Sequence, residues 1–230
     1  MRAVRIAVET MAKAWLAISG RRTAGVVKIG AIRTVSTRLV PAAFAALTAR
    51  FPDLAFELSV GGSERLMSDV AAGRLDAALV ADHVGVPTCL AWSQVLTEPL
   101  FLIAPPAEAW RDDRAPLSEV AFVRHATDVP LARQIDTDLS GLSLAPRDVV
   151  VANTMPAVVA MVAAGLGVAI VPRIAALALA SGTAHRCLFR DGAITCRIGL
   201  VQRQVASRTR LLARLCDALC AGVRADEGAL

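Results

Sequence analysis

Residues 25–80 decide the fold, and they read GVVKIGAIRTVSTRLVPAAFAALTARFPDLAFELSVGGSERLMSDVAAGRLDAALV. Three segments are expected to be strands because they are β-branched, alternating or apolar: Val26–Ile32, Leu54–Val60 and Asp76–Val80. Between them, Thr37–Arg50 carries an apolar face at helical spacing, and a second helix is expected from Ser63, its N-cap, to Gly73. Repeated strand–helix–strand units predict an α/β protein with parallel sheets flanked by helices.

The rest of the chain continues this alternation. The expected strands are Leu90–Ala104, Ala121–Val123, Val149–Ala152, Val168–Val171 and Ile194–Gln202, and the expected helices are Pro130–Leu139, Thr154–Ala164, one starting near Pro172, and Ser207–Val223. A polar pair, Thr97-Glu98, is expected to break the first of these strands. The sequence VAAG occurs at 70–73 and again at 162–165, each time before a buried strand, which indicates two lobes of similar architecture.

The net charge of +5 belongs to the start of the chain. Residues 1–25 hold five basic side chains against one acidic, which leaves +1 for residues 26–230. A DNA-reading surface needs clustered charge on the folded body, so the body is not expected to bind DNA. Residues 1–24 instead predict a helix, with Val4, Val8, Met11, Trp15 and Ile18 spaced as in a coiled-coil seam. Such a helix pairs with a second helix or lies on its own body.

Composition and motifs exclude several other classes. Hydrophobic residues make up 55% of the chain, too many for a disordered protein, and no apolar run has the length of a membrane span. No signal peptide is recognised, so the protein is expected to be cytoplasmic, without membrane contact. The five cysteines contain no C-x-x-C pair and predict neither disulfides nor a metal site. With no catalytic or nucleotide-binding motif, neither an enzyme nor a cofactor is expected.

Polar residues stand where four of the expected helices begin after strands. They are Thr34, Ser36 and Thr37; Ser63; His125 and Thr127; and Asn153 and Thr154. In open α/β sheets, ligands bind beyond the carboxyl ends of the strands, where helix N–H groups favour anions. The four groups therefore predict one small-molecule site between two lobes. The alternative is that each residue only caps its own helix.

Seven motifs, in this order, resemble one family. They are VKIG (27–30), LVP (39–41), RFPD (50–53), GGS (61–63), GRLDAALV (73–80), PLFLIAP (99–105) and VAAGLGVAIVP (162–172). Together they resemble the effector-binding domain of LysR-type transcriptional regulators. The resemblance runs from about Val26 to Leu219, and at its N-terminal side residues 1–24 resemble the end of the family's linker helix.

The resemblance implies a two-lobed, type II periplasmic-binding-protein-like fold, with each lobe a mostly parallel sheet flanked by helices. Lobe I would comprise residues 25–104 and 199–230, and lobe II residues 105–198. The implied function is to sense a small, anionic effector, a carboxylate or an amino acid, held between the lobes. Its implied contacts are Thr34, Ser36, Ser63, Arg124, His125, Thr127 and Asn153. A solute-binding protein of similar fold is the alternative.

The resemblance also implies partners. The chain would form a homo-oligomer, a dimer or, at full length, a tetramer, through Thr37–Arg50 and Leu54–Val60. DNA would be bound only through a winged helix-turn-helix domain, which is missing from these 230 residues.

Overall fold

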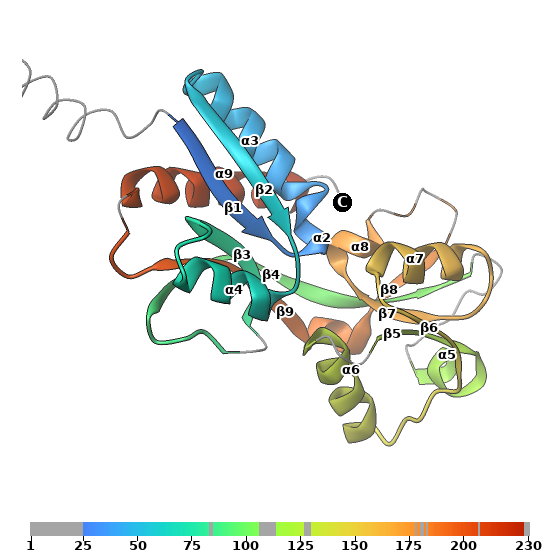
Figure 1. The fold of residues 1–230 in the computed structure, drawn as a ribbon. Coiled ribbons are helices and arrows are strands. Elements are labelled where there is room, and N and C mark those ends of the chain that lie inside the picture. Colours follow the sequence, from blue (N-terminus) through green and yellow to red (C-terminus); the bar gives the residue numbers. More distant parts are fainter. Residues whose placement is uncertain are drawn as a thin grey trace, which may run out of the picture.

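A computed structural model describes residues 25–82, 85–105, 114–126, 130–177, 179, 182, 184–206 and 208–227. The predicted helix at residues 1–24 lies outside the described residues, as does Thr127. Two groups of helices and strands are joined by two long strands (Figure 1), and they are called here the first half and the second half. Within the part of the chain that is described, no helix has both the length and the apolar character needed to cross a bilayer.

The first half is built on three parallel strands. They are β1 (Gly25–Ala31), β2 (Leu54–Val60) and β3 (Ala77–Ala81), and β1 lies between the other two. The helices of this half are α2 (Arg33–Ser36), α3 (Leu39–Arg50), α4 (Ser63–Ala71) and α9 (Thr209–Glu227). The predicted helix at 37–50 begins two residues later, because Arg38 has non-helical backbone angles (φ −129°, ψ −63°) and separates α2 from α3.

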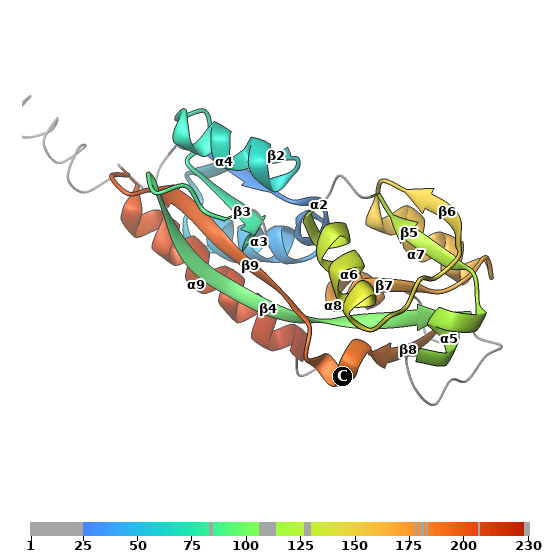
Figure 2. The same ribbon diagram turned by 90° about the horizontal axis from the view of Figure 1, so that it is seen from below.

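Two long antiparallel strands, β4 (Leu90–Ala104) and β9 (Thr195–Arg203), connect the halves (Figure 2). The predicted break at Thr97-Glu98 is wrong. Both residues lie within β4, and Glu98 pairs with Cys196 of β9. The irregularity in the ladder falls earlier, between Gln94 and Leu96. One sheet therefore runs through both halves in the order β2-β1-β3-β9-β4-β7, with β8 also paired to β4.

The second half contains the remaining elements. They are α5 (Arg114–Glu119), β5 (Phe122–His125), α6 (Pro130–Gly141), β6 (Asp148–Ala152), α7 (Met155–Ala163), β7 (Ala169–Pro172), α8 (Arg173–Ala176), β8 (His185–Leu188) and the 3-10 turn η2 (Phe189–Gly192). β5 and β6 form a separate parallel pair, and β7 and β8 lie antiparallel to β4. The sequence did not predict α5, β8 or η2. The fold is the predicted mixed α/β type, with antiparallel pairs added where the two long strands pass between the halves.

The two VAAG segments end their helices by the same mechanism. Gly73 and Gly165 follow α4 and α7 with positive φ angles of 76° and 84°. Gly73 N–H donates to Val70 O and the next N–H reaches Asp69 O, while Gly165 repeats the pattern on Val162. This is the Schellman motif, in which glycine adopts the left-handed conformation at the helix end. Gly165 is therefore a helix terminator.

Fully buried apolar strands form the base of both halves. All five residues of β3 and all four of β7 are buried. The helices α3 and α9 pack together against the sheet of the first half. Three leucines of α9, Leu212, Leu215 and Leu219, are almost fully buried there. Residues at or directly after the carboxyl ends of β1, β2, β3, β5 and β6 line one cavity, as the sequence predicted for the site.

Candidate functional site

A cavity of about 450 Å³ lies between the two halves. The first half contributes the start of α2, the β2–α4 loop and the end of β3, and the second half contributes the ends of β5, β6 and β7. Cys196 and Ile198 of β9 complete the wall. Pockets of 300–1,000 Å³ hold small ligands in proteins, so this cavity has room for one small molecule.

Four of the seven predicted contacts line this cavity. They are Thr34 on α2, Ser63 at the start of α4, His125 at the end of β5 and Asn153 after β6. Thr154, the polar neighbour of Asn153, lines it too. Thr154 occupies the N-cap position of α7, yet its hydroxyl makes no capping hydrogen bond. Capping therefore does not account for this hydroxyl, which leaves it available to a ligand.

Ser63 has a structural role that the sequence did not predict. The N-cap of α4 is Gly62, so the prediction that Ser63 caps the helix is wrong. Ser63 is buried, and its Oγ accepts a hydrogen bond from the backbone N–H of Ala81 at 3.1 Å. This bond ties the first turn of α4 to the end of β3. A serine hydroxyl that accepts one bond still has its own proton to donate, and Ser63 lines the cavity.

Arg124 is engaged elsewhere. Successive side chains of a strand point to opposite faces, and on β5 it is His125 that reaches the cavity. The Arg124 side chain, 15% exposed, forms ion pairs with Asp136 on α6 and Asp148 on β6. Its Nε donates to Asp148 Oδ2 at 2.7 Å. The geometry therefore does not support the prediction that Arg124 contacts a ligand. Its Nε and Nη1 groups already bind two carboxylates of the second half, those of Asp148 and Asp136.

Ser36 also lies outside the cavity lining. Its Oγ donates to the carbonyl oxygen of Arg33 at 2.9 Å, within the short helix α2. It lies two residues beyond Thr34, the last residue of α2 that faces the cavity. The role predicted for Thr127 falls outside the described residues.

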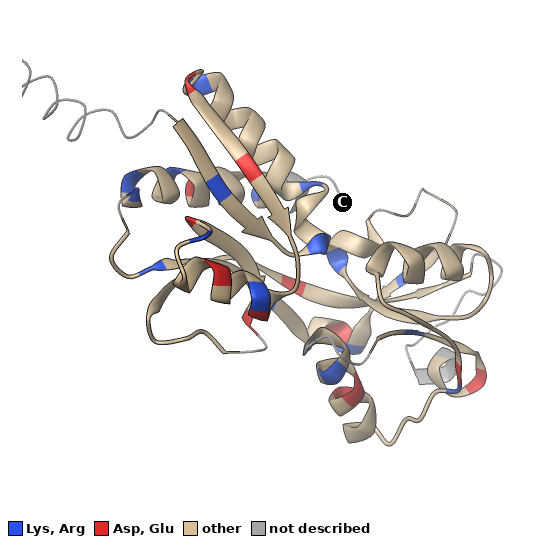
Figure 3. Ribbon diagram, viewed as in Figure 1, with Lys and Arg blue, Asp and Glu red and all other residues tan. Residues whose placement is uncertain are grey.

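The sequence missed three charged residues of the lining: Arg33, Glu64 and Arg65. All three could have been found by the same reasoning, because Arg33 precedes Thr34 and the other two follow Ser63 in the first turn of α4. Arg65 pairs with Asp69 at 3.7 Å on the exposed face of α4. Arg33 donates from Nη1 to the carbonyl oxygen of Asn153 at 3.4 Å. Basic residues stand on α2 and at the start of α8, where these helices meet (Figure 3).

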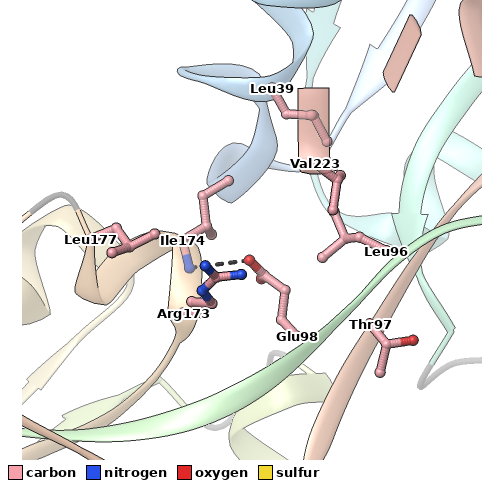
Figure 4. A pocket seen from close by; sticks show the side chains of 8 residues that line it. All are labelled: Leu39, Leu96, Thr97, Glu98, Arg173, Ile174, Leu177 and Val223. Atoms are coloured by element: carbon pink, nitrogen blue, oxygen red, sulfur yellow. Dashed lines mark hydrogen bonds between the residues drawn. The ribbon is translucent and has the colours of Figure 1, made fainter. Parts of the chain in front are cut away.

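A second, much smaller cavity surrounds Glu98 (Figure 4). Glu98 is 6% exposed, and one carboxyl oxygen accepts a hydrogen bond from Ile174 N–H at 3.1 Å at the start of α8. The other oxygen, Oε2, is buried without a partner among the described residues. Burial raises the pKa of Glu98 to about 7, against the opposing effects of the Ile174 N–H and Arg173. Glu98 therefore joins β4, where it passes between the halves, to a helix of the second half.

The cysteines are free thiols. Burial raises the pKa of Cys196, in the cavity wall, to about 12. Burial, together with Cys220, raises the pKa of Cys216 to about 11. Reactive cysteines need a lowered pKa, so these thiols act as small apolar groups. Cys216 and Cys220, one turn apart on α9, are half-buried.

Comparison with known proteins identifies the class. The family model of the LysR substrate binding domain matches residues 20–223. The chain belongs to this family, whose members are ligand-sensing domains of transcriptional regulators. It is 26% identical over 152 residues to the HTH-type transcriptional regulator YybE of Bacillus subtilis (strain 168). That match covers 64% of this chain and 52% of YybE, so the chain spans about half the length of the curated relative.

Solved structures of OxyR share the fold. A full-length OxyR variant from Pseudomonas aeruginosa superimposes with a TM-score of 0.79 at 19% identity, over 99% of this chain and 77% of that one. A reduced form of OxyR from N. meningitidis gives a TM-score of 0.73 at 20% identity, over 86% and 95% of the two chains. These likenesses show the two-lobed, type II periplasmic-binding-protein-like fold predicted from the sequence.

Proposed function

We propose that this chain senses a small anionic molecule, a carboxylate or an amino acid, in the cavity between its halves. The carrying observation is that polar groups from both halves converge on one cavity of about 450 Å³. Thr34 and Ser63 come from the first half, and His125, Asn153 and Thr154 from the second. A ligand that contacts both halves binds some arrangements of them better than others, and only this difference in affinity can shift the equilibrium between them.

The halves correspond in this proposal to lobe I, residues 25–104 and 199–230, and lobe II, residues 105–198. The ligand alters how the lobes are held, and the change passes to the partner subunit. β2 supports the proposed dimer contact, since it is the edge strand of the sheet and leaves Leu58 and Val60 exposed. An unpaired strand edge with apolar side chains favours a protein partner.

Where a winged helix-turn-helix domain accompanies this chain, that domain would bind DNA, and the protein would act as a cytoplasmic homo-oligomer. A regulator of this kind binds its effector without converting it, so we assign no reaction to the cavity. The alternative, a solute-binding protein of similar fold, is disfavoured because the matching family and the matching curated relative are both those of transcriptional regulators.

The proposal is tested by thermal unfolding of the chain in the presence of small carboxylates and amino acids, each compared with its neutral amide. A ligand at 100 times its dissociation constant should stabilise the fold by about 2.7 kcal/mol. Thr154→Trp, which would fill the cavity, should abolish the shift. If every carboxylate and amino acid fails to raise the melting temperature, or if the shift survives in Thr154→Trp, the assignment of the cavity is wrong.

A further inference from the structure

A hydrogen bond spans the cavity from one half to the other. Arg33 lies on α2 in the first half, and its Nη1 donates to the backbone carbonyl of Asn153, between β6 and α7 in the second half. The donor and acceptor are 3.4 Å apart, at the long end of the range for such bonds. Both residues line the same cavity. The contact is therefore a weak one, placed where a ligand would sit.

The charges of the lining differ in how they are balanced. Arg65 already faces a carboxylate, since it lies 3.7 Å from Asp69 one turn along α4, a carboxylate that Arg74 also binds at 2.6 Å. Arg33 forms no ion pair with any residue that the structure describes, and its recorded acceptor is a neutral carbonyl. A guanidinium carries five N–H donors in a fork that fits the two oxygens of a carboxylate. The structure records only one of these donors of Arg33 in a hydrogen bond to a described residue, and that bond is long, at 3.4 Å.

We propose that Arg33 binds a carboxylate of the effector, and that this carboxylate takes the place of the Asn153 carbonyl. The inference rests on the proposed function, because it names the residue and the chemical group through which the same cavity is occupied. Two parallel hydrogen bonds between opposite charges are stronger than one long bond from Arg33 to a neutral carbonyl, so the exchange favours the ligand. Its consequence is that binding releases a direct contact between the two halves.

The neighbouring charges sharpen the inference. Glu64 lies on the same wall and repels a carboxylate that approaches without a cation of its own. Arg65 offers the same charge as Arg33 on the same lining, but on the exposed side of α4 and beside Asp69. Arg65 also lines the cavity, but its side chain is 73% exposed and paired, so its loss should alter the field at the cavity more than any direct contact. This makes Arg65→Gln the matched control for Arg33→Gln.

The affinity test uses succinate, benzoate and glutamate as probes, with succinamide, benzamide and glutamine as neutral counterparts, measured by calorimetric titration. Arg33→Gln should lower the affinity for whichever carboxylate binds the unaltered chain by about tenfold to a hundredfold, as expected for the loss of hydrogen bonds to a charged group. Arg65→Gln should weaken it by less than about threefold, and Glu64→Gln should leave it unchanged or tighter. The neutral counterparts should bind no better to the unaltered chain than to Arg33→Gln.

Inorganic phosphate, titrated in parallel, tests whether the site prefers a carboxylate to another oxyanion. Tighter binding of phosphate than of every carboxylate would overturn the proposal that Arg33 binds a carboxylate. Equal losses in Arg33→Gln and Arg65→Gln would show that the general field, and not a contact, attracts the ligand. Unchanged affinity in Arg33→Gln, with binding still abolished by Thr154→Trp, would reject Arg33 and leave the cavity assignment standing. Absence of binding by every probe would reject both.

The release of the contact has its own readout, amide hydrogen exchange in peptides that cover residues 150–158. Exchange should be faster in Arg33→Gln without ligand, because the second half has lost its bond to α2. Arg65→Gln should exchange at the rate of the unaltered chain. If Arg33→Gln exchanges no faster than the unaltered chain, the bond to Asn153 does not hold the halves, and that part of the inference is wrong.

Discussion

The hydroxyl of Ser63 accepts the backbone N–H of Ala81 at 3.1 Å, so the first turn of α4 and the last residue of β3 are joined at the wall of the cavity. A residue that the sequence suggested as either a helix cap or a ligand contact is thus the acceptor for a strand end. The cavity wall is stiffened by the same atom that can face a ligand.

Ser63→Ala should therefore cost more stability than the loss of a helix cap. The substitution leaves the N–H of Ala81 buried without an acceptor, which costs about 1–3 kcal/mol. Urea unfolding measures the change. Ser36→Ala is the control, because its hydroxyl bonds within α2 and not across the fold. Equal, small losses in both variants would show that the Ser63–Ala81 bond contributes little.

Glu98 should make the fold less stable as the pH rises. Burial raises its pKa from 4.5 to about 7, so the folded state holds a proton that the unfolded chain gives up near pH 4.5. The stabilising effect is complete below that pH, declines through the interval, and is gone above about 7. A shift of this size corresponds to about 3 kcal/mol.

Glu98→Gln, which stays neutral, should remove this dependence and make the chain more stable than the unaltered one at high pH. Urea unfolding at about pH 5 and about pH 8 tests it, since these values bracket the shifted pKa. Glu57→Gln is the control, because Glu57 is an exposed residue of β2 paired with Lys28. If Glu98→Gln follows the same pH profile as the unaltered chain, Glu98 does not titrate in this range.

Most strands and helices of the fold could be predicted because the pattern of apolar residues and the residues that end helices are local features of the sequence. Leu54–Val60 is a strand as predicted, and both VAAG segments end helices through a glycine with positive φ. The failure at Thr97-Glu98 has its cause in contact with a distant part of the chain. Glu98 appeared to break a strand, but the N-terminus of α8, from 76 residues further on, supplies its partner.

The site was predicted in outline for a similar reason. The rule that ligands lie beyond strand ends located Thr34, Ser63, His125 and Asn153 around one cavity. It could not choose between adjacent residues. Arg124 and His125 alternate on β5, and only the positions of Asp136 and Asp148 reveal which one is engaged in the second half. The contact of Arg33 with the Asn153 carbonyl could not be predicted, because the two residues are 120 positions apart in the sequence.

Arg124→Met should destabilise the fold and leave ligand affinity unchanged. The substitution leaves the carboxylates of Asp136 on α6 and Asp148 on β6 without the guanidinium that now binds both of them. Hydrogen bonds to charged groups are each worth about 1.5–3 kcal/mol, and the carboxylates remain partly hydrated, so the expected loss is about 1–3 kcal/mol. Arg65→Met, at an exposed pair, should cost about 0–1 kcal/mol. Urea unfolding compares the two, and a fall in affinity in Arg124→Met with unchanged stability would restore Arg124 to the site.

Thr34→Val tests the hydroxyl that faces the cavity from α2. Valine keeps the β-branched shape and size of threonine, and no hydrogen bond within the described protein depends on the Thr34 hydroxyl, so melting should be unaffected. A ligand acceptor that loses this donor loses about 0.5–1.5 kcal/mol of binding, and more where the acceptor is charged. Thr48→Val is the matched control, since the Thr48 hydroxyl bonds to Phe44 O on α3 and Thr48 is absent from the cavity lining. Ligand affinity, measured by titration, should therefore fall in Thr34→Val and not in Thr48→Val. Equal affinity in the two variants would place the ligand away from α2.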